Sequence, residues 1–404
     1  MKSRATLWLF PVFILFFFLP PTGGSSQSTG HEICLQILAR YNIKSFTLTL
    51  REGSIFSQGR SVITGKIPVT LSLEKKRIMV RKKKVCLLRG RDLIISSHNP
   101  MMIEFIHKHK KFRRFYQGKL QVYRKKNCLL LVNITPLEIY VQAASQAELG
   151  PVLAIKDRAC SQGWRRELTQ AMEIVIRSYL LHMKNRHTDP RYNFCDLTHC
   201  IHFPGVGERL SGSQPSSGRG RVILDETGRP HGAFFHASSG GLLSGPEIFW
   251  PRHRGGKHYR RGTDSLPELK KYLSWRSPHE SWETRLKVRD IEKIFRTRKL
   301  ASIKVCYRQK RAASLELKTT QKVHTVSAAR FMSLVGKRLG WNKIKSNLFT
   351  VTRKGAFFVF KGRGLGHGIG LSQWSAGDLA CRGWTSEEII SYFYNNPELS
   401  EWPR

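Results

Sequence analysis

The sequence predicts an α+β fold in which a strand-rich N-terminal region precedes a mixed α/β region. Residues 33–132 hold several segments where apolar and polar side chains alternate, which is the period of a half-buried strand. Residues 164–182 instead carry an apolar stripe at helical spacing. The chain has 404 residues, of which 40% are hydrophobic, so it can bury the core of two or three domains.

The first 26 residues have the pattern of a secretory signal peptide. Lys2 and Arg4 precede an apolar stretch at 7–19, and prolines and small residues follow up to Ser26. The apolar stretch is short for a membrane span. We therefore expect an exported protein of the periplasm or cell envelope, with an uncleaved N-terminal anchor as the alternative.

Residues 27–132 are expected to form the strand-rich N-terminal region. Phe46, Leu48 and Leu50 alternate with threonines, and residues 69–73 and 120–123 repeat this rhythm. Residues 128–132 are a continuous apolar run, which predicts a strand buried on both faces. The region shows no catalytic motif and is interpreted as a scaffold or binding module.

The net charge of +41 arises from 69 Lys and Arg against 28 Asp and Glu, and it favours polyanionic partners. A general basic bias that only aids solubility is the alternative. The basic runs lie among strand-like segments and include no recognition helix, zinc-finger repeat or RNA-recognition signature. An exported protein also meets no genome. We therefore expect no nucleic-acid partner, and instead cell-wall polymers or an anionic membrane surface.

The second region, residues 133–400, is expected to contain helices, strands and two polar loops. A helix is predicted at 164–182, and a charged helical segment around 266–298. Strands are predicted near 302–307 and 356–360. The remaining predicted features are loops at 205–221 and 252–261 and a final helix that begins with a capping box of Thr385 and Glu388.

Two of the eight cysteines belong to a candidate metal site. His187, Cys195, His199 and Cys200 supply two thiolates and two imidazoles, the donor set of a structural tetrahedral zinc. The spacing is irregular, so a disulfide or unpaired residues are the alternatives. The other cysteines are far apart and are interpreted as free core residues: Cys34, Cys86, Cys128, Cys160, Cys306 and Cys381.

The most specific motif is residues 362–377, in which glycine occupies every second position from Gly362 to Gly370. The spacing fits neither a dinucleotide-binding motif nor a P-loop. Alternate glycines instead allow a close approach of another backbone segment. His367, Gln373 and neighbouring side chains place polar groups beside the Trp374 ring, a combination that suits a sugar. A fixed structural role is the alternative for His367.

This motif resembles the C-terminal signature of the SpoIID/LytB family. Residues 234–241 resemble a second block of that family, residues 167–181 a third, and residues 133–140 the start of its catalytic region. The resemblance implies binding to peptidoglycan glycan strands. It also implies lytic transglycosylase cleavage of MurNAc–GlcNAc bonds in strands without peptides, which leaves 1,6-anhydro ends. The alternative is a non-enzymatic enhancer of a cell-wall amidase.

The resemblance assigns the catalytic acid to Glu148. One carboxyl group suffices for this reaction, because it protonates the leaving oxygen and then takes the proton of the C6 hydroxyl; hydrolases use two carboxylates. For Arg177, an ion pair with Glu173 on the helix surface is the alternative role. The residues predicted to line the glycan groove are Arg177, Tyr179, Ser239, His367 and Gln373.

The zinc prediction is also strengthened by the resemblance. Residues 195–200 are similar to a stretch that carries zinc in some family members. Four protein ligands, His187, Cys195, His199 and Cys200, imply a closed structural site.

The chain departs from the family pattern in two places. Residues 152–163 look like an insertion between the predicted acid and the following helix. Gln170 and Met172 stand where the family typically has Lys and Gln. Both departures favour the non-catalytic alternative.

Overall fold

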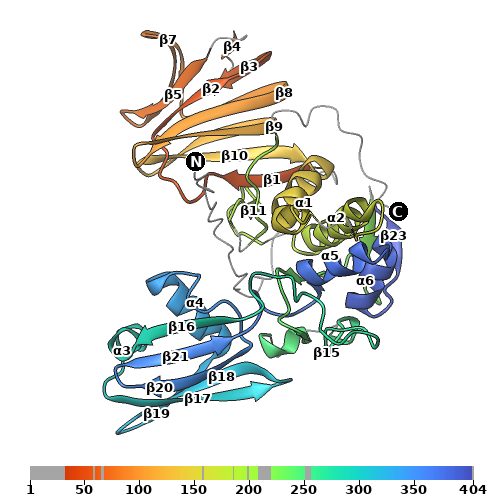
Figure 1. The fold of residues 1–404 in the computed structure, drawn as a ribbon. Helices are drawn as coiled ribbons and strands as arrows, with labels where there is room; N and C mark the ends of the chain where they lie inside the picture. The colour runs from red at the N-terminus through yellow and green to blue at the C-terminus, as the bar shows by residue number, and fades with distance from the viewer. Residues whose placement is uncertain are drawn as a thin grey trace, which may run out of the picture. The chain divides into compact units, whose positions relative to one another are not determined.

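A computed structural model describes residues 32–57, 60–64, 68–156, 159–184, 186–197, 200–207, 220–250 and 256–402. The predicted signal peptide lies outside these residues, as do most of the loop at 205–221 and the first part of the loop at 252–261. The fold is α+β, as predicted (Figure 1). It divides into two compact units.

Unit 1 comprises Lys156–Leu168 and Phe234–Pro397, and unit 2 comprises the described residues up to Ile155, then Thr169–Ala233 and the residues from Glu398. The boundary between the units falls within helix α2 (Trp164–His182).

Unit 2 is built on a large sheet in the order β11-β1-β10-β9-β8-β2-β5-β6-β7, with β3 paired to β8 and β4 paired to β3. Its strands confirm the predicted strand-rich region. They are β1 (Glu32–Ile37), β2 (Ser45–Thr49), β3 (Gly53–Ser57), β4 (Arg60–Thr64), β5 (Val69–Glu74), β6 (Arg77–Lys82), β7 (Val85–Gly90), β8 (Asp92–His107), β9 (Lys110–Lys125), β10 (Cys128–Pro136) and β11 (Phe194–Cys195).

The burial of these strands follows the sequence pattern. Phe46 and Leu48 of β2 are buried, whereas the intervening Thr47 is only half-buried. In β10, residues 129–133 are all buried, which confirms the continuous apolar run as a strand covered on both faces. Helix α1 (Leu137–Leu153) follows β10 directly and packs against it.

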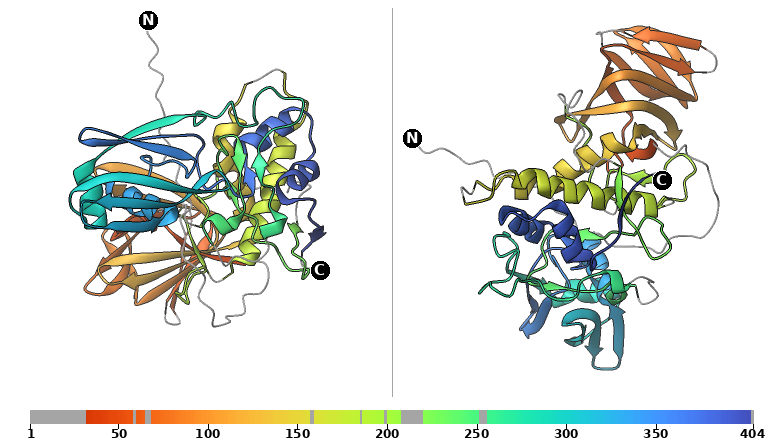
Figure 2. Two further views of the ribbon diagram at one scale, coloured as in Figure 1. Left: turned by 90° about the horizontal axis from the view of Figure 1, so that it is seen from below. Right: turned by 90° about the vertical axis from the view of Figure 1, so that its right-hand side faces the viewer.

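Helix α2 has the predicted bounds, and the views agree that it lies beside α1 (Figures 1 and 2). Residues 170–181 of α2 are all buried, so this segment is covered on every side rather than on one stripe. Unit 2 ends with a two-stranded antiparallel sheet of β12 (Arg221–Ile223) and β23 (Leu399–Glu401).

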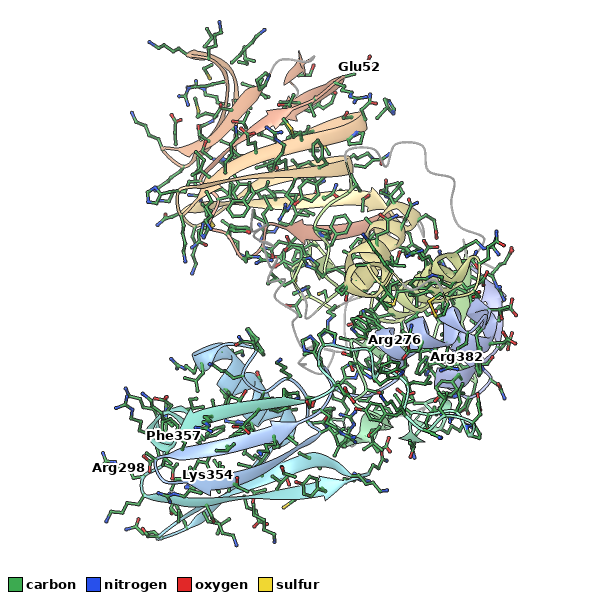
Figure 3. The ribbon with its side chains drawn as sticks, viewed as in Figure 1. Glu52, Arg276, Arg298, Lys354, Phe357 and Arg382 are labelled. Carbon is green, nitrogen blue, oxygen red and sulfur yellow. A yellow bond between two sulfur atoms is a disulfide. The ribbon has the colours of Figure 1, made fainter. Side chains whose placement is uncertain are left out.

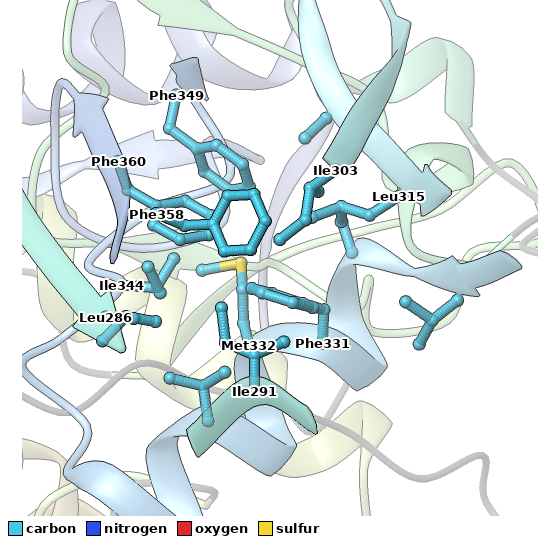
Figure 4. Packing of buried hydrophobic residues seen from close by; sticks show 14 of the residues in the cluster. Leu286, Ile291, Ile303, Leu315, Phe331, Met332, Ile344, Phe349, Phe358 and Phe360 are labelled. Atoms are coloured by element: carbon cyan, nitrogen blue, oxygen red, sulfur yellow. The ribbon is translucent and has the colours of Figure 1, made fainter. Parts of the chain in front are cut away.

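Unit 1 contains two three-stranded antiparallel sheets and two helices around one apolar core. The elements are β16 (Trp282–Lys287), β21 (Phe357–Gly362) and β20 (Phe349–Lys354) in one sheet, β17 (Leu300–Arg308), β18 (Arg311–Thr319) and β19 (Val323–Ser327) in the other, and helices α3 (Val288–Phe295) and α4 (Ala328–Leu339). Figure 4 shows the core, in which the α4 side chains Phe331 and Met332 meet Phe358 and Phe360 of β21.

The helical prediction for 266–298 is wrong for most of that segment. Only α3 is helical; β16 precedes it, and residues 264–281 form turns. Trp282 and Leu286 are buried in β16, whereas Glu283 and Arg285, which alternate with them, are not. This two-residue period is the mark of a strand, and the abundance of charged residues concealed it.

The predicted C-terminal elements are present. Strands β17 and β21 cover the segments near 302–307 and 356–360. Helix α6 (Ser386–Tyr394) begins with the predicted capping box, in which the Thr385 hydroxyl accepts the Glu388 N–H and the Glu388 carboxylate accepts the Thr385 N–H. Among the described residues, no helix combines the length and apolar character that crossing a membrane requires.

One disulfide corrects the interpretation of two cysteines as free core residues. Cys160 and Cys381 are bonded at an S–S distance of 2.10 Å, and both belong to unit 1. Cys381 ends helix α5 (Gln373–Cys381), which begins within the glycine motif. The apparent insertion at 152–163 is therefore linked covalently to this helix. Among the described residues, Cys34, Cys86, Cys128, Cys195, Cys200 and Cys306 form no disulfide.

Candidate functional site

The predicted acid Glu148 lies near the end of α1 in unit 2 and is half-buried. Its Oε1 accepts the backbone N–H of His202 at 3.0 Å. This bond joins α1 to the segment that follows the candidate metal site, and it fixes the direction of the carboxylate. Burial and the charges of Arg40 and Arg114 lower the pKa of His202, so its ring is neutral near pH 7.

Arg177 of α2 is a buried member of a bidentate ion pair. Its side chain is only 1% exposed, and Nε and Nη2 donate to Glu138 Oε1 and Oε2 at 2.8 and 2.6 Å. Nη1 donates to the carbonyl oxygen of Arg221 at 2.7 Å. The guanidinium thus connects α1, α2 and β12, and its ion pair reaches across to α1 at Glu138. Its predicted contact with glycan stays a prediction.

Tyr179, two residues further along α2, is also buried, at 1% exposure. Burial raises the pKa of its hydroxyl, and the nearby Cys200 and Cys195 add to the increase. The phenol therefore lies close to the candidate metal site. A role in glycan binding is untested for this residue as well.

Three of the four predicted zinc ligands come together in unit 2. Cys195 Sγ lies 3.7 Å from Cys200 Sγ, which lies 3.3 Å from His187 Nε2. All three donor atoms lie within 4.8 Å of one another. His199, the fourth predicted ligand, lies outside the described residues. The contact between the two thiols, together with burial, raises the pKa of Cys195.

The backbone around these residues is held by the large sheet. β11 pairs with β1 in parallel, with Gln36 opposite Cys195. Asp196 accepts the N–H groups of Leu38 and Ala39 at 2.6 and 3.1 Å, and burial raises the pKa of this carboxyl to about 6. The two thiols and the imidazole are thus supported by a well-bonded segment. This donor set fits zinc, which prefers thiolate and imidazole ligands.

The glycine motif in unit 1 makes the close backbone approach that its sequence predicts. Gly364, Gly366, Gly368 and Gly370 have φ between 67° and 112°, which side chains rarely allow. The segment runs alongside residues 234–238, the first part of the second family-like block. A Cβ on Gly366 would lie 2.7 Å from the Cβ of His236. Backbone bonds join the two segments, including the mutual pair of Ser238 and Leu365 at 3.0 and 2.9 Å.

His367 lies in the interior of this arrangement. It is 2% exposed, and its Nδ1 accepts the N–H of Ile369 at 3.1 Å. The ring of His236 lies 5.4 Å away between centroids. Burial and the charge of Arg311 lower the pKa of His367 to about 3, so the ring is neutral. This geometry is that of a fixed core histidine, and glycan contact stays a prediction.

Arg311 is a buried cation that lies in no sequence motif. It is fully buried, and Nη2 donates to the carbonyl oxygens of Ser239 and Leu242, both at 2.5 Å. Nη1 donates to Asn347 Oδ1 at 2.9 Å. Burial lowers the pKa of Arg311 to about 9. A Cβ on Gly368 would collide with the guanidinium, so the glycine and the arginine require each other. No signal in the chain near residue 311 indicated this pairing.

Ser239 and Gln373 belong to the same polar interior of unit 1, and neither is exposed beyond 5%. The Ser239 N–H donates to Ser372 Oγ at 3.2 Å, and Ser372 precedes Gln373 at the start of α5. Ser375 then donates to Asp264 at 2.6 Å. Burial raises the pKa of Asp264. The predicted groove residues therefore divide between the units: Glu148, Arg177 and Tyr179 in unit 2, and Ser239, His367 and Gln373 in unit 1.

A cavity of about 670 Å³ opens on unit 1 where the glycine motif begins. Trp282, Tyr307 and Phe349 supply its rings, and Tyr307 is 50% exposed. The Tyr307 hydroxyl donates to the carbonyl oxygen of Phe349 at 3.0 Å, which holds the ring in place. The polar groups of the lining are those of Ser281, Glu283, Lys310, Thr350, Lys361 and Arg363.

The comparison with curated proteins gives a partial match, and no family model matches the chain. The chain is 27% identical over 192 residues to the stage II sporulation protein D of Bacillus subtilis (strain 168), a match that covers 44% of this chain. It spans about half of that relative's length, 48%. The chain is thus similar to a sporulation protein of the type that its motifs resemble.

Proposed function

We propose that this chain is an exported protein that binds peptidoglycan glycan strands and cleaves them as a lytic transglycosylase. The observation that carries the proposal is the similarity to the stage II sporulation protein D. It agrees with the motif at residues 362–377 and with an oriented carboxylate, Glu148. The pattern of the first 26 residues supports export.

In the proposed reaction Glu148 acts first as an acid and then as a base. Its carboxyl proton goes to the glycosidic oxygen as the bond from C1 of MurNAc to that oxygen breaks. The resulting carboxylate takes the proton of the C6 hydroxyl while O6 bonds to C1, closing the 1,6-anhydro ring. The enzyme regains its proton and no water is consumed. The bond from the His202 N–H holds the carboxylate in one direction during both steps.

The cavity beside the glycine motif supports binding of a sugar. Sugars present apolar C–H faces together with hydroxyl groups, and the half-exposed Tyr307 ring lies among polar groups such as Glu283 and Thr350. Tyr307→Ala should weaken binding to glycan strands about fivefold, because stacking on an aromatic ring contributes about 1 kcal/mol. Val323→Ala, at another exposed apolar side chain of unit 1, is the control.

Digestion of glycan strands without peptides tests the catalytic proposal. Wild type should release 1,6-anhydro ends that mass spectrometry detects, and Glu148→Gln should release none. Gln keeps an oxygen that can accept the His202 N–H, so the variant should fold. Glu52→Gln, at an exposed position of the same unit, should cleave like wild type. Equal products from wild type and Glu148→Gln would refute the role of Glu148.

The second candidate function is a non-enzymatic glycan-binding enhancer of a cell-wall amidase. Gln170 and Met172, which stand where the family typically has Lys and Gln, favour this second function. Both are buried, Gln170 at 5% exposure and Met172 completely. Neither is the cationic side chain that the family typically has in this helix. This function predicts glycan binding without product from any variant, and a faster reaction when an amidase is added.

We further propose a structural zinc held by His187, Cys195, Cys200 and His199. Purified protein should contain about one zinc per chain by elemental analysis. Cys195→Ser should lose it, whereas Cys86→Ser, at an exposed thiol, should retain it. A strong chelator should lower the melting temperature of wild type, because structural zinc contributes to folding. Protein without zinc in which Cys195 and Cys200 are disulfide-bonded would contradict the site.

A further inference from the structure

A second cavity, of about 610 Å³, lies on unit 2. The turn between β5 and β6, the start of β8 and the end of β9 line it, together with the segment before β11. Its cationic residues are Lys75, Lys76, Arg77, Arg91, Arg124 and Arg191. We call these six residues and the cavity they line the basic pocket.

The basic pocket has a large excess of positive charge. Asp92 is its one acidic lining residue. Among the residues that the structure describes, Arg191 pairs with Asp189, whereas the other five cations form no ion pair with a carboxylate. These five side chains are all exposed. Like charges gathered around one cavity repel each other, and an anion in the cavity would relieve that repulsion.

Arg191 is held in a fixed orientation at the wall of the pocket. Its Nε and Nη2 donate to the two carboxylate oxygens of Asp189, both at 2.8 Å. Its guanidinium also lies 5.4 Å from the centre of the Tyr123 ring. The Tyr123 hydroxyl donates to Gln121 Oε1 at 2.8 Å. One side of the pocket is thus organised before any ligand arrives, which lowers the entropic cost of binding.

The lysines of the β5–β6 turn are unexpected on conformational grounds. Lys75 and Lys76 have φ of 45° and 66°, and they form the two-residue turn between the paired Glu74 and Arg77. Turns of this kind favour Asn-Gly, because both central residues need a left-handed conformation. A lysine there costs roughly 1 kcal/mol relative to glycine. The turn therefore holds both lysines at the basic pocket at a small cost in hairpin stability.

We propose that the basic pocket binds the phosphate groups of an anionic ligand. Phosphate carries more charge per group than a carboxylate, and it suits both the point charges of Lys75 and Lys76 and the planar donors of Arg191. The phosphates can belong to a soluble polymer or to lipid headgroups, and the chemistry of recognition is the same. This site is separate from the proposed glycan chemistry and does not depend on it.

Binding of inorganic tripolyphosphate, measured by calorimetry at a fixed moderate salt concentration, tests the proposal. Lys75→Asn/Lys76→Gly removes two charges and introduces the preferred turn residues, so it should keep or raise the melting temperature. Its affinity should be about thirty-fold lower, since each basic residue near an anionic group contributes about fivefold. Lys83→Asn/Lys84→Ser removes two exposed charges after the other end of β6 and should bind like wild type.

Vesicles distinguish the source of the phosphates. If headgroups are the ligand, vesicles with phosphatidylglycerol should bind wild type and the control variant but not Lys75→Asn/Lys76→Gly. If a soluble polymer is the ligand, the difference between wild type and Lys75→Asn/Lys76→Gly should appear with tripolyphosphate and not with the vesicles. Equal loss in both variants would mean that binding follows net charge, and absence of binding to either probe would remove the site. Equal competition by duplex DNA in all three proteins would also argue against a dedicated pocket.

Discussion

At the scale of single residues, the buried arginines show how an apparent binding residue can serve the fold. Arg177 has both carboxylate oxygens of Glu138 and a backbone carbonyl as acceptors, and it is 1% exposed. Its sequence position alone could not reveal the partner, because Glu138 lies 39 residues earlier. The helix-surface alternative named Glu173, one turn away, yet Glu173 is itself buried. The local sequence spacing thus drew attention to Arg177 but did not predict its partner, Glu138.

Arg177→Lys should destabilise the chain by about 2–4 kcal/mol, because lysine cannot form the bidentate pair and leaves Glu138 poorly compensated. Urea unfolding at pH 7 measures this change. Arg166→Lys is a control on the same helix, since Arg166 pairs with Glu167 at an exposed position and should change by less than about 1 kcal/mol. Equal, small changes in both variants would show that the buried pair contributes little.

His367 predicts a dependence of stability on pH. Its pKa is about 3 in the folded chain and about 6.5 when unfolded, so between these values the unfolded state binds more protons. The contribution of the neutral His367 ring to the free energy of unfolding is complete above about pH 7. It is lost as the pH falls from 6.5 towards 3. His367→Asn keeps an acceptor near Nδ1 but cannot be protonated. Urea unfolding at pH 7, 6 and 5 should show wild type losing more stability than the variant; parallel curves would contradict this.

At the scale of elements, the sequence predicted those whose pattern is local and regular. Helix α2 has its predicted bounds, and the alternating strands of unit 2 lie where expected. Helix α1 was not predicted, because it begins directly after β10 and contains Gly150 and Pro151 near its end. The glycine motif indicated a close backbone approach, but only the fold shows that its neighbours are residues 234–238 and Arg311. Such partners lie over 50 residues away, beyond any local pattern.

The Cys160–Cys381 disulfide joins elements that are 221 residues apart and predicts a redox-dependent stability. A bond that closes so long a loop constrains the unfolded chain and typically contributes about 2–5 kcal/mol. A mild reductant should therefore lower the melting temperature of wild type. Cys160→Ser/Cys381→Ser should start at the lower value and change little with reductant. An equal effect of reductant on both proteins would assign it to other cysteines.

At the scale of the whole molecule, charge is the dominant feature. Pairing every one of the 28 carboxylates would still leave 41 cations without an acidic partner. Exposed cations such as Arg298 and Lys354 of unit 1 carry part of this excess (Figure 3). The basic pocket of unit 2 carries another part. The composition predicted the excess but not its grouping, because hairpin turns bring together cations that are distant in the sequence.

This excess predicts that salt stabilises the chain. Repulsion among like charges favours the expanded, unfolded state, and salt screens that repulsion over about 10 Å at 0.1 M. Raising sodium chloride from 20 to 300 mM at pH 7 should increase the melting temperature by about 2–4 °C, which corresponds to about 1 kcal/mol for a chain of two units. Surface ion pairs weaken with salt, but each contributes less than about 1 kcal/mol. The melting temperature of Lys83→Asn/Lys84→Ser should be higher than that of wild type at 20 mM sodium chloride, and it should rise less as salt is added.

A melting temperature of wild type that falls with salt would show that ion pairs outweigh the repulsion.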